Sequence, residues 1–358
     1  GLGRHRVLVF LDGMRLTSER RAGVAASFID PLLLGGVEIS QGPSSTYYGS
    51  GALGGSLHLQ TRDQMGDWFA SGYQSHGDQW SNAVGTAGQN YSAGIALRRQ
   101  NRGKSLDGSL KNNGFEQVSF NLSREFNWQN YQAKAIFIGA LGDDIGKDNL
   151  RYPAMRITSY PKERHWLGQF QLSGPNGWLA RSYFHQQRLI TSDIRPAERI
   201  NQVTNRSLDL ALSFEQPWYK GQWQGLWGSD YFVRQNVESE ERELDLETKE
   251  ITQFNALQDA NDRQFAIFAS VNRELGAWLF NAGGRLNYQR QNSRLSDSVS
   301  DKYWTYFAGL SRPLGVFEFK LNLLINRPEI DFRVGIRRVG FRWTILSVED
   351  TSLRGYGS

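Results

Sequence analysis

The residues of this chain that could do chemistry are its histidines, serines and aspartates, and their spacing argues against a catalytic site. Serine and aspartate are abundant, but no Gly-x-Ser-x-Gly nucleophile elbow is present. The histidines lie far apart, without the His-x-x-x-His spacing of a metal site: His5, His58, His76, His165 and His185. Cysteine is absent, so the chain has neither a thiol nucleophile nor a disulfide. The sequence predicts no enzyme, no cofactor and no metal site.

The most specific spacing lies instead in a glycine-dense segment, residues 31–62. Its glycines allow positive φ and close approach of neighbouring chains, as a compact threaded domain requires: Gly42, Gly49, Gly51, Gly54 and Gly55. Before it, the continuous apolar run Val7–Leu11 predicts a strand buried on both faces. Asp12 and Gly13 predict the tight turn that ends this strand.

Residues 1–62 resemble the C-terminal half of the plug domain of a TonB-dependent outer-membrane receptor. The matching motif positions are Asp12, Gly13, Gly42, Pro43, Tyr48, Gly49, Gly51, Ala52, Gly54 and Gly55, in the order and spacing of that family. The segments Ile29-Asp30-Pro31 and Val37-Glu38-Ile39 also match, and an alternating strand follows from Ser56 to Thr61. In this family the neighbourhood of Glu38 pairs acids with arginines between plug and barrel wall. Here Gln41 stands where an arginine is usual, so Glu38 and Gln41 are the expected plug–barrel anchoring positions, with one cation missing.

The rest of the chain has the composition of a membrane β-barrel. No run of about 18 apolar residues is present, which excludes transmembrane helices. A barrel places its lipid-facing side chains at alternate positions, so the average residue stays polar. Aromatic residues make up 13% of the chain, with 11 Trp, many of them near strand ends as interfacial girdles require. The net charge of +5 is scattered along strands and loops, which argues against nucleic-acid binding.

Alternating segments recur along the chain with two kinds of connection between them. Short turns are predicted at 174–177, 219–221, 274–276 and 313–315. Long polar loops are predicted at 101–114, 142–162, 190–204, 236–258 and 290–302, with the acidic run 238–250 as a solvated loop or strand extension. Because antiparallel strands reverse at every connection, all the short turns should lie at the periplasmic rim and the long loops at the cell surface.

These patterns predict an all-β membrane protein: a plug half at 1–62 and part of an antiparallel transmembrane β-barrel at 63–325. The barrel part should hold about 12 to 13 strands, whereas the resemblance implies a closed barrel of about 22 strands. The chain is therefore expected to be a fragment, without signal peptide, energy-coupling box or first plug half. Residues 326–358 lose the strand alternation and are expected to be an aberrant or divergent tail.

The resemblance implies active transport of a bulky nutrient across the bacterial outer membrane, energised by the TonB complex, in contact with lipid and lipopolysaccharide. The ligand expected is an iron chelate, either a siderophore or haem. Tyr47 and Tyr48 at the plug apex and His76 in a loop are candidate ligand-binding residues, although packing against the wall and simple exposure explain them as well. The alternative function is a passive pore or adhesin-like barrel with a vestigial plug.

Overall fold

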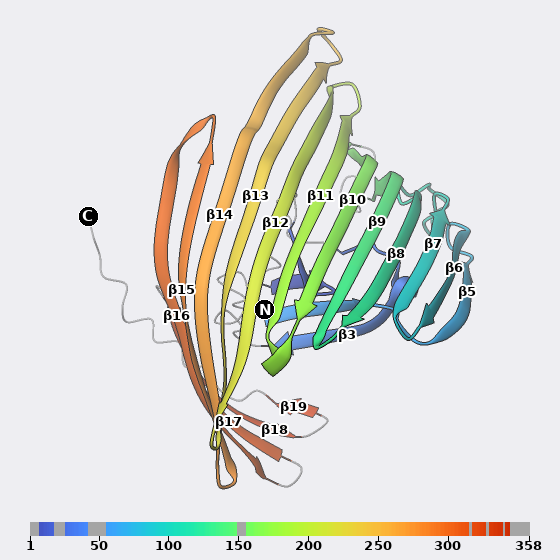
Figure 1. The fold of residues 1–358 in the computed structure, drawn as a ribbon. Coiled ribbons are helices and arrows are strands. Elements are labelled where there is room, and N and C mark those ends of the chain that lie inside the picture. Colours follow the sequence, from blue (N-terminus) through green and yellow to red (C-terminus); the bar gives the residue numbers. More distant parts are fainter. Residues whose placement is uncertain are drawn as a thin grey trace.

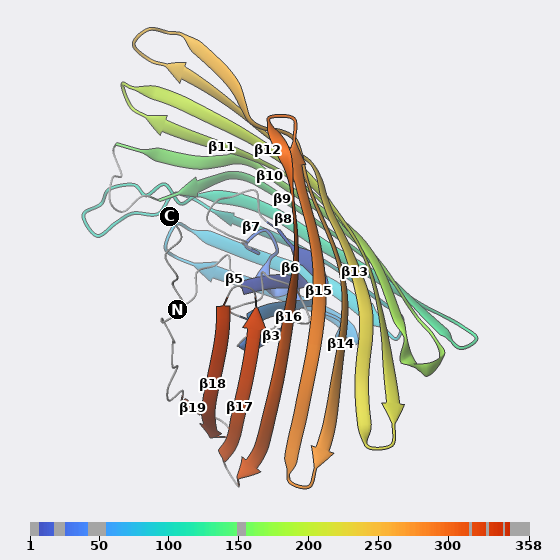
Figure 2. The ribbon, with the colours of Figure 1, turned by 90° about the vertical axis from the view of Figure 1, so that its left-hand side faces the viewer.

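The computed structural model describes residues 7–17, 26–41, 55–148, 155–314, 317–326, 329–338 and 341–343. They form two β-sheets, a small one of four strands and a large curved one of fifteen (Figure 1). The small sheet lies in the concave side of the large one, as a view turned by 90° also shows (Figure 2). In the part of the chain described, no helix is both long and apolar enough to traverse a bilayer.

The small sheet is the plug. It has the order β2-β1-β4-β3 and consists of β1 (Val7–Leu11), β2 (Met14–Leu16), β3 (Leu34–Gln41) and β4 (Gly55–Thr61). β1 and β4 run parallel, and the other pairs are antiparallel. The apolar run in β1 is buried from Leu8 to Leu11, as the sequence predicts for a strand covered on both faces.

The large sheet, called the wall below, is antiparallel throughout, and each of its strands pairs with the next one in the sequence. Its strands are β5 (Gly66–Gln74), β6 (Gln79–Gly88), β7 (Tyr91–Gln100), β8 (Phe115–Trp128), β9 (Tyr131–Lys147), β10 (Ile157–Ser173), β11 (Leu179–Arg195), β12 (Arg199–Lys220), β13 (Trp223–Asp245), β14 (Ile251–Leu275), β15 (Trp278–Ser293), β16 (Ser296–Leu314), β17 (Phe317–Asn326), β18 (Glu329–Arg338) and β19 (Phe341–Trp343). Thirteen of them, β5 to β17, lie within residues 63–326, in agreement with the predicted number.

The two faces of the wall differ as a barrel requires. In β10, His165, Leu167 and Gln169 are buried on the concave side, whereas Phe170 on the convex side is 48% exposed. β11 repeats the pattern, with His185 fully buried and Phe184 exposed. Polar and plug-facing residues therefore alternate with apolar residues that point outward, which is the alternation of a lipid-facing strand.

Aromatic side chains line the end of the wall where the short turns lie. Trp128 contacts Tyr131, Tyr131 contacts Trp178, and Trp178 contacts Phe214, with ring centroids 6.2, 6.2 and 6.3 Å apart. Trp128, Tyr131 and Trp178 stand at or beside a strand end, and Phe214 lies farther along β12. A row of this kind is what an interfacial girdle requires, since amphipathic rings settle at the headgroup level of a membrane.

The short turns are confirmed where they are described. The one at 174–177 joins β10 to β11 through a single 3₁₀ turn, Pro175–Gly177 (η4), with Asn176 and Gly177 both at positive φ. Gly221 and Gly276, also at positive φ, join β12 to β13 and β14 to β15. These connections share one end of the wall (Figure 1). The fourth predicted turn, 313–315, ends outside the described residues.

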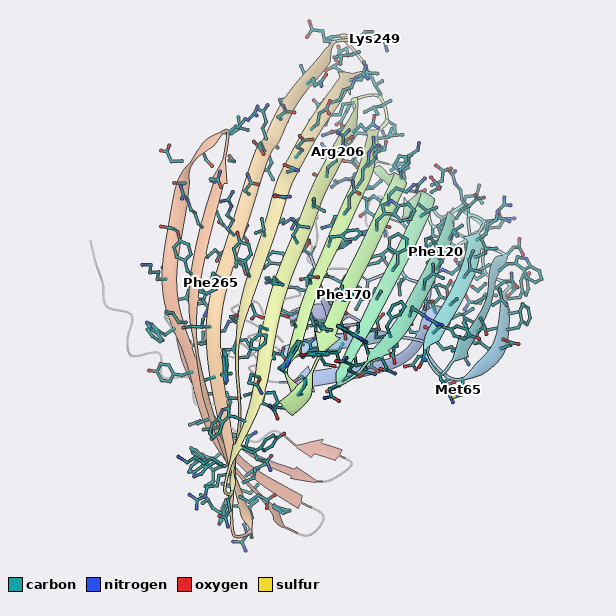
Figure 3. All side chains as sticks on the ribbon, in the orientation of Figure 1. Met65, Phe120, Phe170, Arg206, Lys249 and Phe265 are labelled. Atoms are coloured by element: carbon teal, nitrogen blue, oxygen red, sulfur yellow. The ribbon has the colours of Figure 1, made fainter. Side chains whose placement is uncertain are left out.

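Most of the predicted long loops are shorter in the structure than the sequence analysis expects. Residues 101–114 are irregular, with an isolated bridge between Lys104 and Leu110. The other segments are largely strand, and β11–β12, β13–β14 and β15–β16 are joined by only residues 196–198, 246–250 and 294–295. Backbone pairing continues past the apolar zone because polar side chains pair across the strands, as Arg199 and Glu243 do at 2.9 Å. Lys249 marks the tip of the longest extension (Figure 3).

The expected end of the strand pattern at residue 325 also differs from the structure. β18 pairs with β17 over ten residues of each strand, and β19 continues the sheet to Trp343. The free edge of β17 offers backbone donors and acceptors, so sequence of poor alternation can still pair with it. Residues 344–358 lie outside the described part.

Candidate functional site

The contact between the plug and the wall begins at the turn between β1 and β2. Asp12 and Gly13 have φ of 48° and 84°, the two positive values of a tight hairpin turn. The Asp12 carboxylate accepts hydrogen bonds from the backbone N–H and hydroxyl of Thr61, at 2.9 and 2.8 Å. Burial raises the pKa of Asp12, and the two bonds from Thr61 oppose that rise. Asp12 therefore ties the first plug strand to the end of β4, where the chain leaves the plug for the wall.

One side of the plug is held by apolar packing. Buried side chains of plug and wall form a single cluster, which we call the dry seat: Val9, Leu11, Met14, Leu16, Phe28, Ile29 and Leu59 from the plug, and Ile136, Ile138, Ala140 and Leu167 from β9 and β10. A second, smaller contact joins Leu33 to Ala83 and Ala96 of β6 and β7. Burial of the apolar surface of the seat stabilises the docked plug.

Polar contacts with β7 and β8 frame the dry seat. Asp30 is buried, caps the 3₁₀ turn Pro31–Leu33 (η2) through the N–H of Leu32, and donates its own N–H to the hydroxyl of Ser119 at 3.1 Å. Its carboxylate lies 3.7 Å from the guanidinium of Arg98. Gln117 donates to the backbone carbonyls of plug residues 27 and 28. These bonds satisfy backbone groups that the tightly packed plug segment would otherwise bury unpaired.

Further along the wall, β2 of the plug is followed by a polar contact with β11 and β12. Thr17 donates its hydroxyl proton to Asp209 and accepts a hydrogen bond from Gln187 at 2.8 Å. Asp209 is fully buried and lies 3.6 Å from the guanidinium of Arg234 on β13. The plug is thus fixed to a charged group within the wall, and not only to apolar side chains.

Two of the five histidines, far apart in the sequence, meet in the structure. Nδ1 of His165 and Nε2 of His185 are 3.0 Å apart, and both rings are buried. Phe28 of the plug stacks on His165 with ring centroids 3.9 Å apart. The sequence could have indicated this pair. The predicted hairpin turn at 174–177 sets the register in which Leu167 pairs with His185, and this register puts both histidines on one face.

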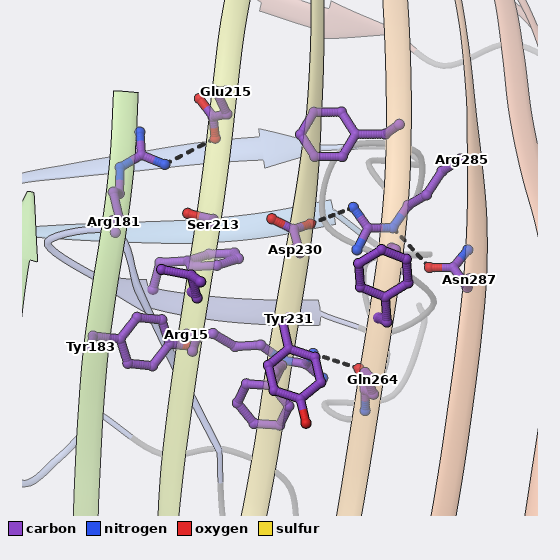
Figure 4. A pocket seen from close by; sticks show the side chains of 18 of the residues that line it. Arg15, Arg181, Tyr183, Ser213, Glu215, Asp230, Tyr231, Gln264, Arg285 and Asn287 are labelled. Carbon is purple, nitrogen blue, oxygen red and sulfur yellow. Dashed lines mark hydrogen bonds and ion pairs between the residues drawn. The ribbon is translucent and has the colours of Figure 1, made fainter. Parts of the chain in front are cut away.

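The opposite side of the plug borders a polar hollow. A cavity of about 440 Å³ lies between the β1–β2 turn with its neighbour His58 and strands β10 to β16 of the wall. Arg181 pairs with Glu215 at 2.9 Å, Arg285 pairs with Asp230 at 2.6 Å, and plug residue Arg15 donates to Gln264 at 3.2 Å (Figure 4). The hollow contains acids and bases that neutralise one another, so it carries no strong charge of one sign.

The predicted plug motif is only partly within the described residues. Tyr47, Tyr48, Gly42, Pro43, Gly49, Gly51, Ala52 and Gly54 lie outside them. Gly55 opens β4 with a φ of 120°, opposite Val7 and Gln41. Glycine is required there because an L side chain rarely adopts that conformation.

The predicted anchoring and ligand residues lie at the periphery. Glu38 is exposed on β3 and faces His58 across the strand pair, and Gln41 ends β3. Burial lowers the pKa of His58, and the nearby Glu38 carboxylate opposes this shift. His76 is exposed in the turn between β5 and β6, where its ring lies against Gly103 of the 101–114 loop. Anchoring by Glu38 and Gln41 and ligation by His76 stay predictions.

Comparisons with known proteins agree with this architecture. The TonB-dependent receptor plug domain family matches residues 1–56. A hemin receptor from Yersinia pestis is 34% identical over 110 residues, which are 31% of this chain and 16% of that protein. The ferrienterobactin receptor of Escherichia coli is 28% identical over 81 residues, 20% of this chain and 11% of that protein.

Solved structures share the fold at low identity. The copper transporter OprC matches with a TM-score of 0.72 at 13% identity, over 89% of this chain and 54% of that one. The siderophore receptor PiuA from Acinetobacter baumannii matches with a TM-score of 0.67 at 12% identity, over 90% and 57%. The chain thus spans little more than half of these structures, and its matches with curated relatives span about a sixth of their length or less. Residues 1–56 thus belong to the plug domain family of TonB-dependent receptors, and the curved antiparallel wall shares its fold with the solved outer-membrane receptors.

Proposed function

We propose that the complete protein is an active-transport receptor that carries a bulky nutrient, an iron chelate such as a ferric siderophore or haem, across the outer membrane. The observation that supports this most directly is the dry seat, in which eleven buried side chains from plug and wall form one apolar cluster. A plug held by such a cluster does not leave the lumen by thermal motion alone, because exposing the cluster to water is unfavourable. External force is then required, and the TonB complex is the partner that supplies it.

The orientation of the wall follows as part of the same proposal. The short turns at Gly177, Gly221 and Gly276 lie at the periplasmic rim, and the tips of the strand extensions lie at the cell surface. The row of Trp128, Tyr131 and Trp178 near the short turns supports this placement, since aromatic girdles mark a membrane interface. The ligand then approaches from the side of residues 101–114 and 246–250, where His76 also lies.

Ligand class rests on the relatives, two of which carry hemin and ferrienterobactin in their names. His76 is a candidate haem ligand because it is exposed in the turn between β5 and β6, at the outer end of the wall. Tyr47 and Tyr48 are candidates at the plug apex. Lipid and lipopolysaccharide are the proposed surroundings of the exposed apolar residues on the convex face.

The test compares uptake by the complete receptor in strains with and without the TonB complex. Haem or a ferric siderophore is given as the sole iron source, and growth and accumulation of labelled iron are measured. We expect uptake to be abolished without the complex, because the dry seat keeps the lumen closed. A passive pore or adhesin would behave differently: iron accumulation unchanged by loss of the complex rejects active transport.

A further inference from the structure

A chain of four titratable side chains crosses the wall beneath the plug. Glu163 Oε1 lies 3.5 Å from His165 Nε2, the two imidazoles meet at 3.0 Å, and His185 Nδ1 lies 4.0 Å from Asp209 Oδ2. All four residues are buried. We call this arrangement the histidine chain. Nothing in the proposed transport step uses it, and among the described residues no group of three or more such ligands is placed to hold a metal ion.

The histidine chain can be analysed by counting protons. It has three gaps between adjacent groups: carboxylate to imidazole, imidazole to imidazole, and imidazole to carboxylate. Each gap needs one N–H to become a hydrogen bond, but two neutral imidazoles carry only two N–H groups. The central gap of 3.0 Å has hydrogen-bond length, whereas the outer gaps of 3.5 and 4.0 Å do not. A neutral pair therefore leaves at least one outer gap without a proton.

The outer ring nitrogens show this deficit. His165 Nε2 and His185 Nδ1 are buried and have no hydrogen-bond partner among the described residues. A third proton on the pair would supply one N–H to every gap and would let both carboxylates close onto the rings as charge-assisted bonds. Charged groups that face the histidine chain include Glu163, Asp209, Arg234, and the more distant Arg15 and Asp262.

The histidine chain touches the plug at its imidazoles and at Asp209. Phe28 stacks on His165 and approaches His185 at a centroid distance of 6.1 Å. Thr17 binds Asp209. A protonated imidazole under Phe28 adds a cation–π attraction to the stacking. It also orients the Asp209 carboxylate, to which Thr17 donates its hydroxyl proton. Protonation therefore strengthens two contacts that hold the plug in place.

We propose that the Glu163–His165–His185–Asp209 chain is a one-proton latch, which holds the plug more firmly when the histidine pair takes up a third proton and loosens it when that proton leaves. This inference rests on the proposed function, because it assigns regulation to the same plug seat. The third proton completes the hydrogen bonds of the histidine chain, so the plug is held more firmly at acidic pH and less firmly at alkaline pH. Uptake that requires release of the plug would then be slowed by acid.

The test uses a nitroxide spin label on Ser27→Cys in the complete receptor, with any other cysteine removed. Ser27 is exposed and adjoins Phe28, and the 358 residues shown contain no cysteine. We expect the strongly immobilised part of the spectrum to be lost progressively as the pH is raised from about 4, because a buried imidazole holds its proton less readily than an exposed one. The double variant His165→Gln/His185→Gln keeps polar side chains of similar reach but cannot take up the proton, so its spectrum should not change with pH.

The matched control is His58→Gln, which removes a plug histidine that is not part of the histidine chain. Its response to pH should equal that of the unmodified receptor. The latch is rejected if the unmodified receptor shows no pH response, or if His58→Gln abolishes the response while the double variant keeps it. Because the double variant could alter folding, barrel integrity is checked by the heat-dependent shift of its electrophoretic mobility. If that check fails, the milder single variant His185→Gln replaces it and must also remove the response.

The spectroscopic result is independent of transport. Uptake that does not depend on the TonB complex, together with a pH-dependent label, rejects the proposed function and leaves the latch. Uptake that depends on the complex, together with a label insensitive to pH, rejects the latch alone.

Discussion

The two sides of the plug meet the wall in different ways. Toward β9 and β10 the interface is closed and apolar, and Ile138 and Leu167 have no exposed surface. Toward β12 to β16 the plug leaves a cavity of about 440 Å³ whose arginines are matched by acids. The difference teaches that the plug adheres to the wall through one face and leaves open space at another. The dry seat resists displacement, while the polar hollow offers a region in which side chains can move without exposing a core.

The largest expected effect separates the two faces of one wall strand. Ile138→Ala should destabilise the plug by about 2–5 kcal/mol, because it leaves a cavity in the dry seat. Phe137→Ala, the next residue on the convex face, should have much less effect on the plug, since Phe137 is 37% exposed and points outward. Hydrogen exchange of the β1 and β4 amides in the complete receptor measures both. If both variants accelerated this amide exchange equally, the assignment of Ile138 to the dry seat would be contradicted.

A second pair of variants compares neighbouring arginines on β7. Asp30→Asn weakens the contact with Arg98 and the cap of the η2 turn inside the seat, and should cost about 1–3 kcal/mol of plug stability. Glu116→Gln removes the exposed partner of Arg99 and should change stability by less than about 1 kcal/mol. Urea titration followed by the same amide exchange reports the values. If Glu116→Gln lowered plug stability as much as Asp30→Asn, burial of the ion pair would not explain its contribution to stability.

The hollow is tested by filling it. Ala211 lines the cavity, whereas Leu210 beside it is 37% exposed on the convex face. Ala211→Trp should lower iron uptake strongly while plug stability changes by about 1 kcal/mol or less, because open space receives the new ring. Leu210→Trp should leave uptake unchanged. If both variants transport iron at the normal rate, the hollow is not needed for passage.

The smallest effect concerns Asp12, which stands between seat and hollow. Its folded-state pKa is raised by burial, so the folded plug binds a proton that the unfolded chain releases first. The stabilisation from Asp12 is thus fully present below its unfolded pKa and is lost as the pH rises through the raised folded value. Asp12→Asn should remove this decline at a cost of about 1 kcal/mol or less. Plug stability measured by urea across acidic pH checks the sign: an increase with pH that requires Asp12 would contradict it.

Several features of this protein follow from local sequence alone. The Asp12-Gly13 turn forms as predicted because the two residues tolerate positive φ, and the β1 run is buried because it is apolar on both faces. The wall strands follow from the alternation of apolar and polar residues. The turns at Gly177, Gly221 and Gly276 follow from the ability of glycine to adopt positive φ. The loop lengths do not follow, because polar strands continue wherever a partner strand satisfies their backbone, and a search for apolar alternation cannot detect that.

The identity of the plug contacts depended on tertiary structure. The residues that seat the plug, Asp30, Thr17 and Phe28, gain their roles from partners about 90 to 190 positions away, on strands whose distance from the plug is not encoded locally. His165 and His185 are 20 residues apart, and hairpin register joins them, but only the arrival of the plug on that face buries them together. Sequence determined which side chains alternate along each strand. The curvature of the wall around the plug decided which of those faces became a seat, a hollow or a lipid-facing surface, because burial is a property of what packs opposite and not of the strand itself.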